Sequence, residues 1–199
     1  MLVSVEGCWL HRNLSSHQVV FFHDKGTGGL RLDEPYLIGF QYSRPDDNLR
    51  GKGDHFGTSE GIDRNKNLPE LYLPPELSKK KQRRYRRSDD VYSMGIILFE
   101  AALWEPVQVF YEDGNTAWDV AEKIVETAEI ELASETGELY RDAVLSCIRG
   151  LRKEEKPPTS DSDTDSNEYD GKYRGEDPEY GLEVDFLWRV LREIEKCKV

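Results

Sequence analysis

The residues with the clearest potential for chemistry lie near the start of the chain, in the run WLHRNLSSHQVVFF at positions 9 to 22. Cys8 and His11 have the spacing of two zinc ligands, but a structural zinc site needs four ligands and the sequence offers no second pair. We therefore expect no metal site here. The polar residues from His11 to Gln18 instead precede a β-branched and aromatic run, which is typical of a loop that leads into a strand.

Three further motifs follow this loop, and their order is that of a protein kinase. HRNLSSHQVVFF resembles a kinase catalytic loop, LIGF at 37 to 40 falls at the Asp-Phe-Gly motif, and LPPEL at 73 to 77 resembles the Ala-Pro-Glu motif. SDDVYSMGIILFEAALWEP at 88 to 106 resembles the buried helix that comes next in the family. The resemblance runs from residue 9 to about 151 and implies the C-terminal lobe of a protein kinase-like domain. Its details are similar to the degenerate kinase-like domains of filamentous fungi that accompany HeLo-type, prion-inhibition or heterokaryon-incompatibility proteins.

The residues that match the chemical positions of a kinase cannot perform its chemistry. By resemblance, Asn13 stands at the catalytic base, and its amide is not basic near neutral pH. Ser15 matches the lysine that contacts the transferred phosphate, and Gln18 is one methylene longer than the metal-binding Asn it matches. Leu37 matches the metal-binding Asp and offers no oxygen. Together they predict a pseudokinase, not an enzyme, that uses no ATP, magnesium or other cofactor.

The positions that hold a kinase lobe together are better preserved, namely His11, Arg12, Gly39, Glu76 and Asp90. The resemblance implies that Asp90, at the start of the buried helix, accepts hydrogen bonds from the backbone of the catalytic loop. It also implies that Glu76 makes a buried ion pair with an arginine near the end of the lobe. The family's arginine motif is absent there, so Arg149 and Arg152 are the remaining candidates.

The elements that must position these residues follow from periodicity, and they predict a mainly α fold with a small β component. Short strands are expected within 19–40, a long exposed loop over 41–70, and a helix that starts at Asp89 or Asp90 and is apolar on every face. Helices over 117–132 and 138–151 have apolar stripes, namely Trp118, Ala121, Ile124, Val125 and Ala128, and Leu139, Ala143, Val144, Cys147 and Leu151. A last stripe comprises Leu187, Val190, Leu191 and Ile194.

The composition divides the chain into three parts. Residues 1–152 form the kinase-like lobe, and 153–181 are acidic and nearly devoid of aliphatic side chains, which predicts a disordered linker. Residues 182–199 form an amphipathic helix that we expect to dock back onto the lobe.

The nucleotide-binding half of a kinase would precede the catalytic loop, and only eight residues precede Trp9. We therefore expect the N-terminal lobe to be absent. The helix over Val91–Trp104 should then expose an apolar flank, which predicts association with a protein partner or with an upstream N-lobe.

The charge and the targeting features of the sequence indicate the cellular compartment in which the protein is expected. The net charge of -12 disfavours nucleic-acid binding, and no apolar run is long enough to span a membrane. Three widely spaced cysteines and the absence of a secretory signal indicate a cytoplasmic protein. The basic run from Lys79 to Arg87 is a nuclear localisation signal, a patch for an acidic partner or a solvated loop, and these readings stay open.

The sequence thus favours a non-catalytic, kinase-like interaction or signalling module. Two alternatives stay open. The chain is part of an active or ATP-binding kinase whose N-lobe lies elsewhere, or it is a gene remnant without independent function.

Overall fold

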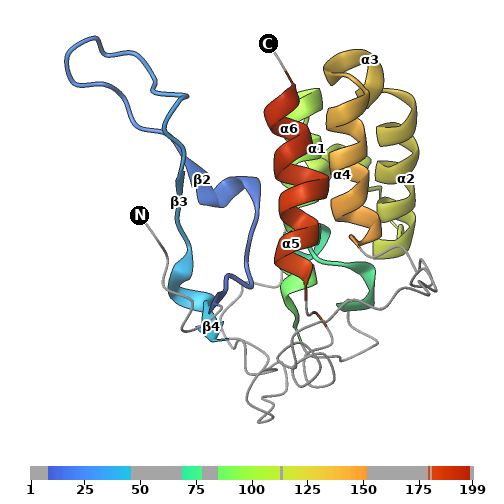
Figure 1. Ribbon diagram of the computed structural model, residues 1–199. Coiled ribbons are helices and arrows are strands. Elements are labelled where there is room, and N and C mark those ends of the chain that lie inside the picture. The colour runs from blue at the N-terminus through green and yellow to red at the C-terminus, as the bar shows by residue number, and fades with distance from the viewer. Residues whose placement is uncertain are drawn as a thin grey trace, which may run out of the picture.

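The computed structural model describes residues 9–45, 69–77, 85–112, 114–151, 179 and 181–197. Over these residues the fold is mainly helical, as predicted, with two small antiparallel two-stranded sheets. The helical body contains α1 (Arg87–Leu103), α2 (Ala117–Ile130), α3 (Leu132–Thr136) and α4 (Glu138–Arg149). The chain closes with α5 (Leu182–Phe186), the π-helical turn η7 (Leu187–Leu191) and α6 (Arg192–Lys196), which run on as one helix beside α4 (Figure 1).

The N-terminal segment, residues 9–45, contains the strands found in the described part of the chain. β1 (Trp9–Leu10) pairs with β4 (Arg44–Pro45), and β2 (Val19–Val20) pairs with β3 (Tyr36–Leu37) in a hairpin that projects away from the helices (Figure 1). Short 3-10 helices complete the fold: η1 (Ser16–Gln18), η2 (Phe40–Tyr42), η4 (Pro69–Tyr72), η5 (Pro75–Leu77) and η6 (Val107–Phe110). The strands predicted within 19–40 are confirmed. Residues 46–68 of the predicted loop lie outside the described residues.

The central helix α1 begins two residues before the predicted start. Asp89 lies in its first turn, where the carboxylate accepts the backbone N–H of Arg86 at 2.7 Å, and this bond caps the helix. Further along, Gly95 faces α4 at close range, because a Cβ at this position would lie 2.7 Å from the Cβ of Cys147. A glycine is therefore needed for α1 and α4 to pack this closely.

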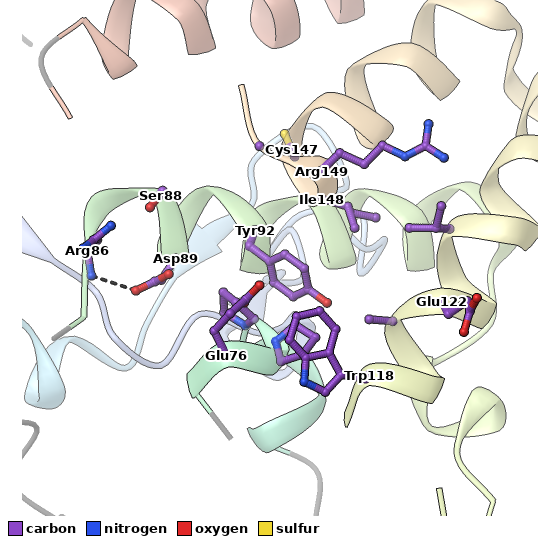
Figure 2. Close-up of a pocket in the computed structure, with 15 residues that line it drawn as sticks. Glu76, Arg86, Ser88, Asp89, Tyr92, Trp118, Glu122, Cys147, Ile148 and Arg149 are labelled. Carbon is purple, nitrogen blue, oxygen red and sulfur yellow. Dashed lines mark hydrogen bonds between the residues drawn. The ribbon is translucent and has the colours of Figure 1, made fainter. Parts of the chain in front are cut away.

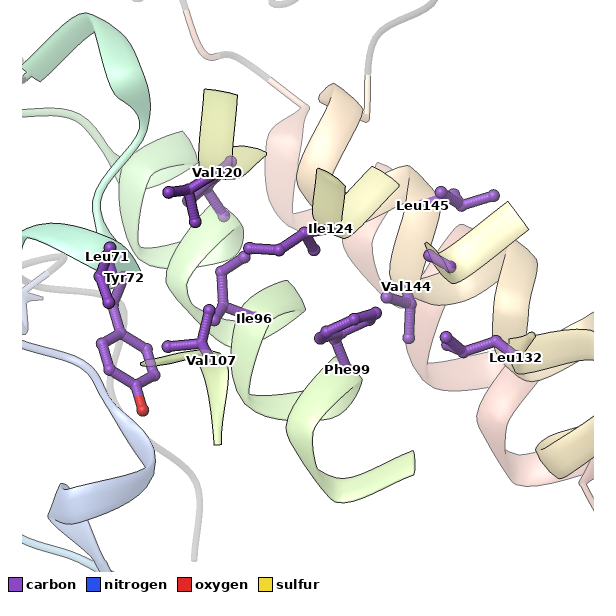
Figure 3. Packing of buried hydrophobic residues seen from close by; sticks show 12 residues of the cluster. Leu71, Tyr72, Ile96, Phe99, Val107, Val120, Ile124, Leu132, Val144 and Leu145 are labelled. Atoms are coloured by element: carbon purple, nitrogen blue, oxygen red, sulfur yellow. The ribbon is translucent and has the colours of Figure 1, made fainter. Parts of the chain in front are cut away.

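The core lies between α1 and the three helices that follow it. Ile96 and Phe99 of α1 are fully buried and point toward side chains of α2, α3 and α4 (Figure 3), namely Val120, Ile124, Leu132 and Val144. Two residues of the predicted stripes do not belong to this core: Trp118 is 55% exposed and Leu139 is 42% exposed. Both lie in the first turn of their helix, where fewer neighbouring elements cover the surface.

The C-terminal helix docks back onto the body, but the predicted face is wrong in part. Val190 is fully buried and Ile194 is partly buried, whereas Leu187 and Leu191 are 41% and 43% exposed. The inner face has a period of four residues, namely Leu182, Phe186, Val190 and Ile194. The π-helical turn explains this period, since it widens the helix and rotates later residues relative to a regular α-helical wheel.

The apolar flank expected on α1 is not found. From Val91 to Trp104, every apolar side chain is buried or half-buried except Ala101 and Trp104, and Trp104, 88% exposed, lies just beyond the last residue of α1. The C-terminal helix explains the difference, because Val91 and Leu98 pack against the cluster that Leu182 and Val190 form with α4. The expectation of an open flank was therefore wrong.

The end of the predicted linker is also attached to the body. Glu179 is buried, and its carboxylate accepts the backbone N–H groups of Arg87 and Ser88 at 2.8 and 3.0 Å, which caps the start of α1. The linker boundary predicted at Gly181 therefore lies too late in the chain. Residues 152–178 lie outside the described part. No helix among the described residues has the length and apolar character that a membrane span requires.

Candidate functional site

The loop that follows β1 is held to α1 by a single carboxylate. Asp90 accepts the backbone N–H of His11 through Oδ2 at 2.8 Å and that of Arg12 through Oδ1 at 3.1 Å. Asp90 follows His11 by 79 positions and Arg12 by 78 positions in the sequence. The contact expected for Asp90 is therefore present, and it fixes the backbone where the loop leaves β1. We call this arrangement the Asp90 clamp.

Tyr85 completes the Asp90 clamp from the side of α1. Its hydroxyl donates to Oδ1 of Asp90 at 2.7 Å, and the guanidinium carbon of Arg12 lies 5.9 Å from the centre of its ring. Burial raises the pKa of Asp90 above its ordinary value, and the three hydrogen bonds to the carboxylate act in the opposite direction. Burial also raises the pKa of Tyr85, and the neighbouring charge of Asp90 adds to this effect. Tyr85 therefore stays protonated and serves as a donor.

The His11 side chain extends the attachment to the hairpin. Nε2 of His11 donates to the carbonyl oxygen of Ile38 at 2.9 Å, since a carbonyl can only accept. The imidazole also packs edge-on against the ring of Phe40, with 4.9 Å between the ring centroids. This engaged imidazole is a structural bridge, and Cys8, its possible zinc-binding companion, lies outside the described residues.

Gly39 and Gln18 lie close together where the chain enters β2 and leaves β3. Gly39 has a φ of +93°, and a Cβ added there would lie 2.3 Å from Oε1 of Gln18. The backbone of Ile38 donates to the carbonyl of Gln18 at 2.8 Å. The glycine is thus required both by its left-handed backbone and by the space that the Gln18 side chain occupies.

The structure brings Gln18 and Leu37 to the same end of the hairpin, and Asn13 and Ser15 lie in the loop before it. Ser15 is 8% exposed, Asn13 and Gln18 are half-buried, and Leu37 is 39% exposed. None of the four side chains is a carboxylate or a cation. Within the described part of the chain, no three His, Cys, Asp or Glu side chains gather in a way that could hold a metal ion.

The ion pair expected for Glu76 is not made with Arg149. The guanidinium of Arg149 pairs with Glu129 of α2 instead, and Arg152 lies outside the described residues. Glu76 and Arg149 nevertheless line one open groove of about 690 Å³, where Tyr92 and Trp118 form part of the wall (Figure 2). The groove brings together the start of η5, the start of α1, one side of α2 and the last turn of α4.

Sequence reasoning missed a second polar contact between the N-terminal segment and the body. Glu100 is 7% exposed, and its Oε1 accepts the Tyr72 hydroxyl and the Val107 N–H, each at 2.7 Å. Ser16 then donates to the Tyr72 oxygen at 2.8 Å. A carboxylate within an apolar helix was the available signal, because such a group must find donors when it is buried.

Comparison with protein-family models, with curated proteins and with solved structures found no match to this chain.

Proposed function

We propose that this chain is a non-catalytic, kinase-like interaction module, the C-terminal lobe of a pseudokinase. The observation that supports the proposal best is that the Asp90 clamp fixes the loop backbone while the residue next to it lacks a basic group. The backbone of His11 and Arg12 is held in place, while the next residue, Asn13, has no basic group. The clamp thus fixes the position of a loop in which the residue proposed for the catalytic base, Asn13, cannot accept a proton near neutral pH.

Asp90, whose carboxylate holds the backbone just before Asn13, is a poor replacement for the missing base. Asp90 already accepts three hydrogen bonds, from two backbone N–H groups and the Tyr85 hydroxyl. A general base must lie within hydrogen-bond reach of the proton it removes, whereas both oxygens of Asp90 are directed at the groups that they hold. Asp33 and Glu34 contact Arg31 at 3.8 and 2.6 Å, within the arm of the hairpin that leads to β3. These contacts favour a structural role for the acids in this segment.

The interaction part of the proposal is supported by the surface of the hairpin. Eight large apolar side chains in residues 21–40 are each more than a third exposed: Phe21, Phe22, Leu30, Leu32, Tyr36, Leu37, Ile38 and Phe40. Exposed apolar side chains in such number on one segment are typical of binding surfaces. The partner is a protein, and a kinase N-lobe supplied by a separate polypeptide is one form of it. The cytoplasm or the nucleus is the proposed location.

A phosphotransfer assay tests the proposal. The purified chain with magnesium, labelled ATP and a generic protein substrate should transfer no phosphate above the buffer control. Asn13→Asp should remain inactive, because Gln18 and Leu37 still offer no metal ligands of the required kind. Transfer that survives purification and is abolished by Asn13→Ala would overturn the proposal. Magnesium-dependent ATP binding without transfer would favour the ATP-binding alternative. A chain that fails to unfold cooperatively would favour the gene remnant.

A further inference from the structure

The C-terminal helix is joined to the start of α1 by a set of charged groups. Glu179 accepts the N–H groups of Arg87 and Ser88, and its Oε2 also lies 3.6 Å from Nε of Arg87. The Arg87 guanidinium pairs in turn with Glu183, in the first turn of the C-terminal helix. Hydrogen bonds to ionised groups are the stronger kind, and the side chains of Glu179 and Arg87 are only 9% and 12% exposed. We call these contacts the Glu179 strap.

The Glu179 strap and the Asp90 clamp act on the same turn of α1. The first N–H groups of an α-helix have no partner within the helix, and Glu179 supplies the acceptor for two of them. Asp90 lies two residues beyond Ser88 and holds the backbone of the loop that follows β1. The first turn of α1 is therefore the place to which both the C-terminal helix and the N-terminal segment are attached.

The same two parts of the chain also share a pocket beside this turn. The pocket has a volume of about 310 Å³, and Leu10 of β1 lines it together with Val91 of α1 and with Leu182 and Phe186 of the C-terminal helix. Leu10 and Leu182 are 2% and 6% exposed, so both belong to the interior. The space of the pocket gives the first turn of α1 room to move when one of the two attachments is released.

We propose that the Glu179 strap is a conformational device that couples the C-terminal helix to the N-terminal segment. With the strap in place, the first turn of α1 is capped and Asp90 stays in position to hold the loop. When the strap is released, two N–H groups lose their acceptor and the first turn frays, so that Asp90 no longer lies at a fixed distance from the loop backbone.

The coupling acts in both directions. Release of the C-terminal helix frees the loop after β1, and by thermodynamic linkage release of the loop loosens the C-terminal helix by the same factor. The coupling passes through the first turn of α1 and leaves the core between α1, α2 and α4 intact. It rests on these contacts alone and is independent of the proposed function.

Amide hydrogen exchange of the full chain, followed by NMR, tests the coupling with Glu179→Gln. The new side chain has nearly the same shape, but it has no charge for Arg87 and its NH2 group cannot accept, so at least one backbone N–H loses its acceptor. The amides of His11 and Arg12 and those of the C-terminal helix should each exchange at least about fivefold faster. Amides in the middle of α2 and α4 should keep their protection.

Glu126→Gln is the matched control, because it makes the same change in net charge at an exposed position of α2. Exchange in this variant should equal that of the parent. Asp90→Ala tests the reverse direction, since it should also speed the exchange of amides in the C-terminal helix. Faster exchange confined to one of the two parts, no change in either, or an equal loss of protection in α2 and α4 would overturn the coupling.

Discussion

The helical body and the N-terminal segment are stabilised in different ways. The body has two clusters of buried apolar residues, which connect α1 with α2, α3, α4 and the C-terminal helix. Neither cluster contains a residue from 9–45. Over the described residues, the segment is attached through the Asp90 clamp, through the hydrogen bond between Ser16 and Tyr72, and through two buried apolar side chains, Leu10 and Leu14. Its large apolar side chains mostly face solvent.

This difference suggests a division of roles. A shared core would make the segment and the body unfold together, whereas a few hydrogen bonds allow the segment to open on its own. The segment also contains Asn13, Ser15, Gln18 and Leu37, which the proposed function assigns to the degenerate chemical positions of a kinase. The contrast therefore favours a stable helical platform that presents a loop and an apolar hairpin to a partner, and the following predictions test that contrast.

The largest change in the free energy of unfolding is expected for a substitution in the core of the helical body. Phe99 is fully buried against Phe110, with ring centroids 5.3 Å apart, and Phe99→Ala should lower the free energy of unfolding by about 3–5 kcal/mol. Trp104→Ala is the control, since Trp104 is 88% exposed, and should change it by less than about 0.5 kcal/mol. Urea denaturation followed by circular dichroism measures both. Equal losses would mean that the core has been misplaced.

A smaller and local effect is expected in the N-terminal segment. Gly39→Ala places a side chain in a left-handed conformation and against Gln18, at a cost of about 1–2 kcal/mol. The amide of Ile38, which donates to the Gln18 carbonyl, should exchange faster, while amides of α4 should not. Gly29→Ala is the matched control in the same hairpin, because its Cβ would meet only Thr27 Oγ1 at 3.5 Å. Faster exchange in α4 would indicate that the two regions are coupled.

The smallest effects concern carboxyl titration. Backbone hydrogen bonds hold the pKa of Asp24 and of Asp119 below the ordinary 3.8, whereas burial raises that of Asp90. The first two contribute stability that is present above pH 3.8 and is lost as the pH falls through their lowered pKa values. For Asp90 the sign is opposite: its contribution is complete below 3.8 and decreases as the pH rises through its raised pKa. Carboxyl chemical shifts measured by NMR should titrate in that order, and an Asp90 midpoint below that of Asp24 would contradict the burial of the clamp.

Much of the helical body could be predicted from the sequence, because its apolar residues follow the helical period. The position of α1 and the burial of Ala143, Val144, Cys147 and Leu151 agree with the periodicity. The C-terminal helix was placed correctly but its face was not. A π-helical turn has no clear sequence signature, and a helix with two apolar stripes does not reveal which one faces the core.

In the candidate site, the contacts that a sequence motif implied could be predicted. The contacts that arise only from packing in the folded chain could not. The hydrogen bonds that Asp90 accepts from the backbone of His11 and Arg12 were expected from the resemblance alone. The contact between Gly39 and Gln18, and the contact between Ser16 and Tyr72, depend on residues far apart in sequence with no spacing rule. The kinase-like assignment stays a proposal.

Amide hydrogen exchange on Asp90→Ala tests most directly the claim that a buried carboxylate, rather than a shared core, holds the N-terminal segment. The variant leaves the His11 and Arg12 N–H groups without their acceptor, at a cost of about 1–3 kcal/mol. Amides in residues 9–45 should therefore exchange roughly 5- to 150-fold faster, while α4 and the part of α1 beyond its first turn keep their protection. Asp33→Ala, in which a 76% exposed side chain is removed from the same segment, should leave exchange unchanged. Equal loss of protection in α4 and in residues 9–45, or no loss in either, would contradict the account.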